Sequence, residues 1–221
     1  MTLMGPDALR GYSKETLMRR IHSPMTLLLG LLGFSGCADS TAPGDTTRDP
    51  AELNVVRLAQ TSPPLFNGVD SFYARKGEDR ELRIYFQDAV GGSGEEFLRL
   101  KVSAPSLLAR PDGTPFLVND SILITVRVVD PIRILFEMEP AGLTFAPGTP
   151  AELKIHYAHA DHDFDEDGSI DSVDDQIKSQ LAIWRQETLS DPFVRLGSVN
   201  EVTLEEINAD ILGFTRYAIA Y

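Results

Sequence analysis

The sequence predicts an all-β fold with at most one or two short helices, in which antiparallel strands form a sandwich or a barrel. Two observations support this prediction. Apolar residues recur at every second position in many short segments, which is the pattern of strands with one buried face. Breaks rich in Gly, Pro, Asn and Asp separate these segments, and helical periods of roughly ten residues are missing between them.

The first clear strands lie in the middle of the chain. Apolar and polar residues alternate in 82–87 and again in 98–102. Residues 122–128 and 132–138 repeat the pattern, and the turn signal Asp130-Pro131 stands between them. We expect these last two segments to pair as a hairpin.

The C-terminal half continues in the same way. A helix is expected only at about 173–178, and the aromatic side chains of Phe145 and Trp184 are expected in the core, because large aromatics in strands usually fill the interior. Further strands are expected at 153–157, 181–186, 193–199, 202–207 and 212–220.

The N-terminal region resembles a bacterial lipoprotein signal peptide. Arg19 and Arg20 precede an uncharged apolar run, 25–34, and Ser35 and Gly36 lead to the single cysteine, Cys37. The run is shorter than the ~20 residues of a membrane-spanning helix. The resemblance implies that residues 1–36 are removed, that translation starts at Met18, and that Cys37 carries a lipid anchor. The alternative is a buried apolar helix that ends in a core thiol.

The residues after Cys37 divide into a tether and a domain. Residues 37–50 are mainly Asp, Ser, Thr, Ala, Pro and Gly without apolar periodicity, the composition of a flexible tether. We expect one β domain over 51–221. With one cysteine in the whole chain, and that one acylated, disulfides cannot brace this domain.

The charge of the chain limits its partners. Its 33 acidic and 20 basic residues give a formal net charge of −13. Such a surface repels phosphate backbones and anionic headgroups, which argues against nucleic-acid binding and against electrostatic membrane attachment. The charge suits cations and basic partners.

Residues 163–174 have the spacing of a calcium-binding loop and resemble the loop of an EF-hand. Acidic residues stand at positions 1, 3, 5, 9 and 12, with Gly168 at position 6, where the backbone must turn sharply. We expect one bound Ca²⁺ and an inward-pointing Ile170. The expected ligands are the side chains of Asp163, Asp165 and Asp167, the main-chain carbonyl of Ser169, Asp171 directly or through water, and Asp174 as the closing carboxylate.

Weak binding is expected, because Asp174 is one methylene shorter than the Glu usual at position 12, as in dockerin-like variants. Two other interpretations remain open. The segment can be a solvated acidic loop without a metal. Zinc is the other alternative, since His156, His159 and His162 precede the loop at intervals of three.

Part of the chain resembles a β-sandwich module found in ankyrins, netrin receptors and tight-junction scaffolds. The residues that carry the resemblance are Pro140, Gly142, Leu143 and Phe145 with the alternating stretch up to Tyr157, then Trp184 and 213–217. It covers about 105–221 and implies an antiparallel β-sandwich with a noncatalytic interaction role. The calcium loop is then an insertion between the strands that contain Leu153 and Leu181, and residues 51–104 add strands outside the module.

Together these patterns predict a noncatalytic, calcium-binding β-sandwich that is lipid-anchored in the bacterial cell envelope, with a protein or glycan partner. Ala38 after the cysteine favours the outer membrane. Two alternatives are an envelope hydrolase and a carbohydrate-binding module with a structural calcium. The latter would need a row of exposed aromatics, for which Phe72, Tyr73 and Tyr85 are the candidates.

Overall fold

The computed structural model describes residues 47–221. The expected signal peptide 1–36, the lipidation site Cys37 and the first part of the expected tether lie outside the described residues. Strand β1 (Thr47–Arg48) pairs with β11 (Phe193–Arg195). A paired strand is therefore present slightly before the expected domain boundary at residue 51.

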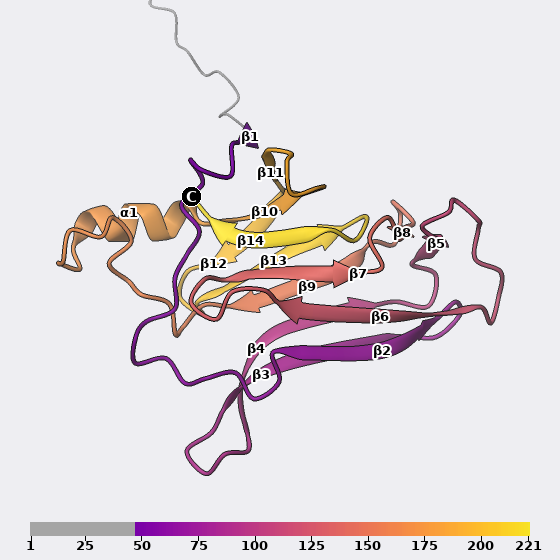
Figure 1. The fold of residues 1–221 in the computed structure, drawn as a ribbon, viewed down its shortest axis with the longest axis horizontal. Coiled ribbons are helices and arrows are strands. Elements are labelled where there is room, and N and C mark those ends of the chain that lie inside the picture. Colours follow the sequence, from indigo (N-terminus) through magenta and orange to yellow (C-terminus); the bar gives the residue numbers. More distant parts are fainter. Residues whose placement is uncertain (1–46) are drawn as a thin grey trace, which may run out of the picture. The chain divides into compact units, whose positions relative to one another are not determined.

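Antiparallel strands form two main sheets, which confirms the prediction of an all-β sandwich (Figure 1). The larger sheet has seven strands in the order β1-β11-β10-β14-β7-β6-β2. Its further members are β10 (Ala182–Gln186), β14 (Arg216–Ala220), β7 (Leu135–Glu139), β6 (Ser121–Val128) and β2 (Val69–Arg75).

The smaller main sheet has five strands in the order β12-β13-β9-β4-β3. These are β12 (Ser198–Glu201), β13 (Glu206–Ile211), β9 (Ala151–His156), β4 (Ser93–Val102) and β3 (Arg80–Gln87). A two-stranded sheet of β5 (Leu107–Ala109) and β8 (Thr144–Phe145) lies at one end of the sandwich, and the helix α1 (Ser172–Gln180) lies at the opposite end (Figure 1).

The main core lies between the two large sheets. Leu82, Ile84 and Phe86 of β3 are at most 3% exposed, while the residues between them are only partly buried, as the alternation predicts. Phe145 is 1% exposed in the same core. Because both inner faces are apolar along whole strands, burial of this surface holds the sheets together.

Trp184 belongs to a second, smaller apolar cluster. It is 3% exposed and packs with Leu53, Phe193 and alanines of β10 and β14. Its indole Nε1 donates a hydrogen bond to the carbonyl of Ala220. Trp184 is therefore buried as expected, in a cluster that the N-terminal segment around Leu53 helps to cover.

The hairpin predicted around Asp130-Pro131 is present, since β6 and β7 pair antiparallel. The expected strand 132–138 is wrong at its start, because β7 begins at Leu135. Residues 132–134 pair with the N-terminal segment instead: the amide of Leu58 donates to the carbonyl of Ile132, and the amide of Ile134 to that of Val56.

The expected strands 193–199 and 202–207 are also corrected. Residues 193–195 belong to the seven-stranded sheet and 198–201 to the five-stranded sheet, so the chain changes sheet near Gly197. Residues 202–205 form a turn in which Glu205 has φ 52°, and β13 starts at Glu206. Alternating polarity indicates which residues are buried but not which sheet they join.

The expected strand 212–220 is shorter, since β14 covers only 216–220. Residues 212–214 pair with 143–145 instead, through hydrogen bonds from Phe145 to Leu212 and from Phe214 to Leu143. A Cβ atom at Gly213 would lie 3.1 Å from the Leu143 carbonyl oxygen. Glycine therefore permits this close approach.

Residues 51–104 extend both sheets. β2 pairs with β6 at one edge of the seven-stranded sheet, and β3 and β4 complete one edge of the five-stranded sheet. The acidic segment and α1 connect β9 to β10, so they form the crossover between the two main sheets. Within residues 47–221, no helix has the length and apolar character needed to cross a membrane.

Candidate metal centre

The acidic loop is anchored to the sandwich through Phe164. This side chain is 5% exposed and belongs to the main core. Its ring lies 5.9 Å from the His162 ring and 6.4 Å from the Tyr221 ring, measured between centroids. The Tyr221 hydroxyl donates a hydrogen bond to the Phe164 carbonyl. These contacts fix the backbone between Asp163 and Asp165.

The backbone turns at the position the spacing predicts. Gly168 has φ +90°, the left-handed region in which glycine is favoured. The two carboxylate oxygens of Asp163 accept hydrogen bonds from the amides of Asp167, at 3.0 Å, and Gly168, at 2.9 Å. Asp163 therefore lies inside the turn.

Helix α1 begins with a capping box, and it confirms the helix expected at 173–178. Asp171 is the N-cap, and its side chain accepts a hydrogen bond from the amide of Val173. Asp174 accepts in return from the Asp171 amide, at 2.9 Å, and also from the Phe164 amide, at 2.6 Å. The helix start therefore directs the Asp174 carboxylate back to the beginning of the loop.

Three of the six expected ligands converge. Asp163, Asp165 and Asp174 each offer a carboxylate oxygen, and these atoms lie within 4.8 Å of one another. Asp174 is only 2% exposed. Among the described residues, no Lys or Arg forms an ion pair with these three carboxylates. The cluster is therefore a set of close negative charges without a protein cation.

The side chains of Asp167 and Asp171 are not part of this cluster. Asp167 accepts a hydrogen bond from the Ser169 amide, and the Asp171 side chain is used by the helix cap. Ser169 is exposed. The inward orientation expected for Ile170 is wrong, because its side chain is 71% exposed.

The pKa shifts in the cluster have different causes. The pKa of Asp165 is raised, first by desolvation and then by the negative charges of Asp167, Asp174 and Asp163. The pKa of Asp174 is lowered, first by the hydrogen bond from the Asp171 amide. Asp174 is thus stabilised as a carboxylate, while Asp165 experiences the repulsion that a divalent cation would remove.

The three histidines contact three separate groups of acids. His156 lies 3.5 Å from Glu96, His159 lies 2.9 Å from Glu95, and His162 lies 3.5 Å from Glu205. No two of these histidines share an acidic partner, and the candidate metal cluster of the described residues contains carboxylates alone. The geometry therefore favours a hard cation with oxygen ligands over zinc.

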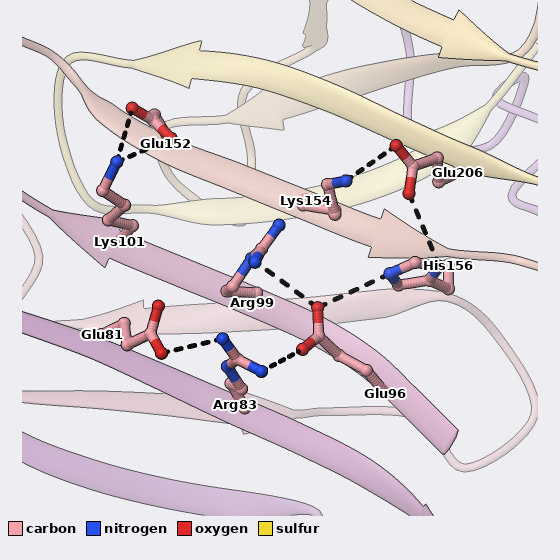
Figure 2. A network of polar contacts seen from close by, with 9 residues as sticks. All are labelled: Glu81, Arg83, Glu96, Arg99, Lys101, Glu152, Lys154, His156 and Glu206. Atoms are coloured by element: carbon pink, nitrogen blue, oxygen red, sulfur yellow. Dashed lines mark hydrogen bonds and ion pairs between the residues drawn. The ribbon is translucent and has the colours of Figure 1, made fainter. Parts of the chain in front are cut away.

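Figure 2 shows a second polar group, which spans β3, β4, β9 and β13. Arg83 and Arg99 are cross-strand partners, and Glu96 contacts both, at 3.1 and 3.7 Å. Lys154 donates to Glu206 at 2.7 Å, and this hydrogen bond is the first cause of the lowered pKa of Glu206. Every acid drawn has a basic partner, so the network compensates charge across the strands.

The aromatic residues considered for glycan binding do not form one row. Tyr73 is 65% exposed on β2, whereas Phe72 is partly buried against the main core. Phe72 and Tyr85 line a shallow groove together with Asp70 and Arg83. Tyr73 is not part of its lining.

Comparisons with protein-family models, curated proteins and solved structures gave no match. Function must therefore be argued from the site itself.

Proposed function

We propose that this chain is a noncatalytic β-sandwich protein whose loop 163–174 binds one Ca²⁺ that stabilises the crossover between the two sheets. The observation that carries the proposal is the convergence of Asp163, Asp165 and Asp174 within 4.8 Å. Calcium takes six to eight oxygen ligands in a flexible shell, and the three carboxylates of the loop supply oxygen ligands of this kind. Magnesium fits less well, because its small octahedral shell keeps more water.

The position of the loop in the fold supports a structural role for the ion. The loop and α1 form the connection from β9 to β10, and Asp163 and Asp174 belong to opposite ends of the loop. An ion held by both would fix the start of α1 against the segment that carries the buried Phe164. Calcium would thereby order the crossover and rigidify one end of the sandwich.

We further propose that the protein acts in the bacterial cell envelope as a lipoprotein, on the resemblance of residues 18–37 to a lipoprotein signal peptide. The resemblance of 105–221 to an interaction module supports a noncatalytic role there. In that location we expect a calcium affinity of roughly 10⁻⁴ to 10⁻³ M, the range of extracellular modules.

The test is thermal unfolding with excess calcium and with chelator, accompanied by calorimetric titration. At about 100 times the dissociation constant, calcium adds ~2.7 kcal/mol to the folded state, which raises Tm by roughly 5–10 °C in a domain of this size. Asp163→Asn should abolish this rise. Asp175→Asn is the matched control, since Asp175 is exposed on α1 outside the cluster. Equal rises in both variants would refute the calcium site.

A carbohydrate-binding role is the second candidate, because Phe72 and Tyr85 line one groove with Asp70, Glu81 and Arg83. A glycan array would test it, with Tyr85→Ala as the variant. Glycan binding that Tyr85→Ala leaves unchanged would exclude this groove.

A further inference from the structure

A polar cleft of about 590 Å³ lies beside the acidic loop. It is lined by residues of the N-terminal segment 50–57 and by residues of the acidic loop, among them Asp163, Phe164 and Gly168. Two arginines, Arg57 and Arg133, also line it. We call this cavity the arginine cleft.

The two arginines are brought together by the fold. Arg57 and Arg133 are partners in an antiparallel β-bridge. The bonds from Leu58 to Ile132 and from Ile134 to Val56 flank this pair, so it is a non-hydrogen-bonded pair, the type in which opposite side chains lie closest. Like charges directly opposite each other are destabilising. An anion between the guanidinium groups would relieve this repulsion.

The acidic residues of the cleft satisfy only one of the two arginines. Arg57 forms an ion pair with Glu166 at 3.1 Å, with both side chains about half exposed. Arg133 is exposed and, within residues 47–221, has no side-chain ion pair. A planar guanidinium with free donors is the group that best recognises carboxylate or phosphate.

The charge of the lining explains why an anion would need the metal. The side chains that line the cleft include two arginines and four acids, Asp161, Asp163, Glu166 and Asp167. Their net charge of −2 repels an anion, and a Ca²⁺ held by Asp163, Asp165 and Asp174 would offset part of the negative charge beside the cleft. Calcium would therefore favour an anion at Arg133 through the field inside the cleft.

We propose that the arginine cleft binds an anionic group, a carboxylate or a phosphate, between Arg57 and Arg133, and that calcium in the adjacent loop strengthens this binding. The inference rests on the proposed calcium site. The proposed calcium ion would then have a second role beside its structural one, the support of anion binding. By linkage, the bound anion would strengthen calcium binding by the same factor by which calcium strengthens anion binding.

The experiment is an NMR titration of the purified protein, observing the arginine Nε–Hε signals, with free calcium held constant by electrode. Glucuronate supplies the carboxylate, glucose 6-phosphate the phosphate, and glucose the neutral control on the same scaffold. Each is titrated with calcium and with chelator, and calcium binding is measured calorimetrically on the same sample. Arg133→Gln removes the unpaired cation, and Arg127→Gln is the matched control, because Arg127 is exposed on β6 away from the cleft.

In the presence of calcium, we expect one or both anions to shift the Nε–Hε signal of Arg133, whereas glucose should leave this signal unchanged. The anion that binds shows whether the cleft accepts a carboxylate or a phosphate. Arg133→Gln should weaken binding about tenfold, the effect of losing one charge-assisted hydrogen bond, and chelator should weaken it in the parent. If calcium binds but neither anion does, the cleft inference fails and the proposed function stands. The calcium-coupled anion site is refuted if calcium does not bind or if glucose binds as well as the anions. It is also refuted if chelator leaves anion binding unchanged, or if Arg127→Gln weakens anion binding as much as Arg133→Gln does.

Discussion

Replacing Phe164 by Ala tests whether the loop is fastened to the core. Phe164 is 5% exposed and packs against the His162 and Tyr221 rings. Removing a buried Phe side chain costs about 3–5 kcal/mol, through lost transfer free energy and the cavity left behind. The low end, about 3 kcal/mol, applies here, because its two ring neighbours are themselves partly exposed. Tm should fall by roughly 6–12 °C.

The assay is urea unfolding followed by the fluorescence of the single tryptophan, which is 3% exposed in the folded protein. The midpoint should fall without a change in the slope m, since the denatured state is unaltered. Phe66→Ala is the control, because Phe66 is 51% exposed and should lose less than about 1 kcal/mol. Equal losses at the two positions would refute the view that Phe164 anchors the loop.

Two further substitutions test the charges. Asp165→Asn should raise Tm in chelator, because it relieves repulsion among the carboxylates, and should reduce the rise that calcium produces; scanning calorimetry in which Tm in chelator does not increase, or in which the calcium-induced rise equals that of the parent, would contradict this. Glu206→Gln should cost about 1 kcal/mol at neutral pH, since Glu206 is paired with Lys154 and its side chain is 12% exposed. Because the folded pKa of Glu206 is lowered, its contribution is present above the unfolded pKa of about 4.3 and is lost as pH falls through the folded value. The difference between Glu206→Gln and the parent in urea unfolding should therefore shrink on acidification, and a difference that stays constant would exclude this linkage.

The sequence was sufficient to predict which residues of the regular strands are buried. In β3 the alternation of Leu82, Ile84 and Phe86 with polar residues matches the burial of the strand, because side chains on a strand point alternately to the two faces. The same signal could not show that the chain changes sheet near Gly197. Strand pairing depends on contacts distant in sequence, which a local pattern does not contain.

The loop spacing predicted the three carboxylates that converge, whereas Asp167 and Asp171 stand outside their cluster. Asp167 and Asp171 accept hydrogen bonds from local backbone amides, and Asp163 and Asp174 do the same, which is a common role of short acidic side chains. The capping box itself was readable, since an acid at 171 is followed by another at 174. A capping residue and a ligand have the same residue type, so spacing alone does not separate them.

The arginine cleft could not be predicted from the sequence. Arg57 and Arg133 stand far apart in the chain and meet only through the bridge between the N-terminal segment and 132–134. Neither residue lies in a motif. Their proximity follows from the tertiary pairing that also shortened the strand expected at 132–138.

The most direct measurement is a crystal structure of the protein grown with excess calcium. We expect one ion at about 2.3–2.6 Å from carboxylate oxygens of Asp163, Asp165 and Asp174, with the capping box at Asp171 intact. A well-ordered loop in which these oxygens contact only water and backbone amides, with calcium in excess, would contradict the proposed function.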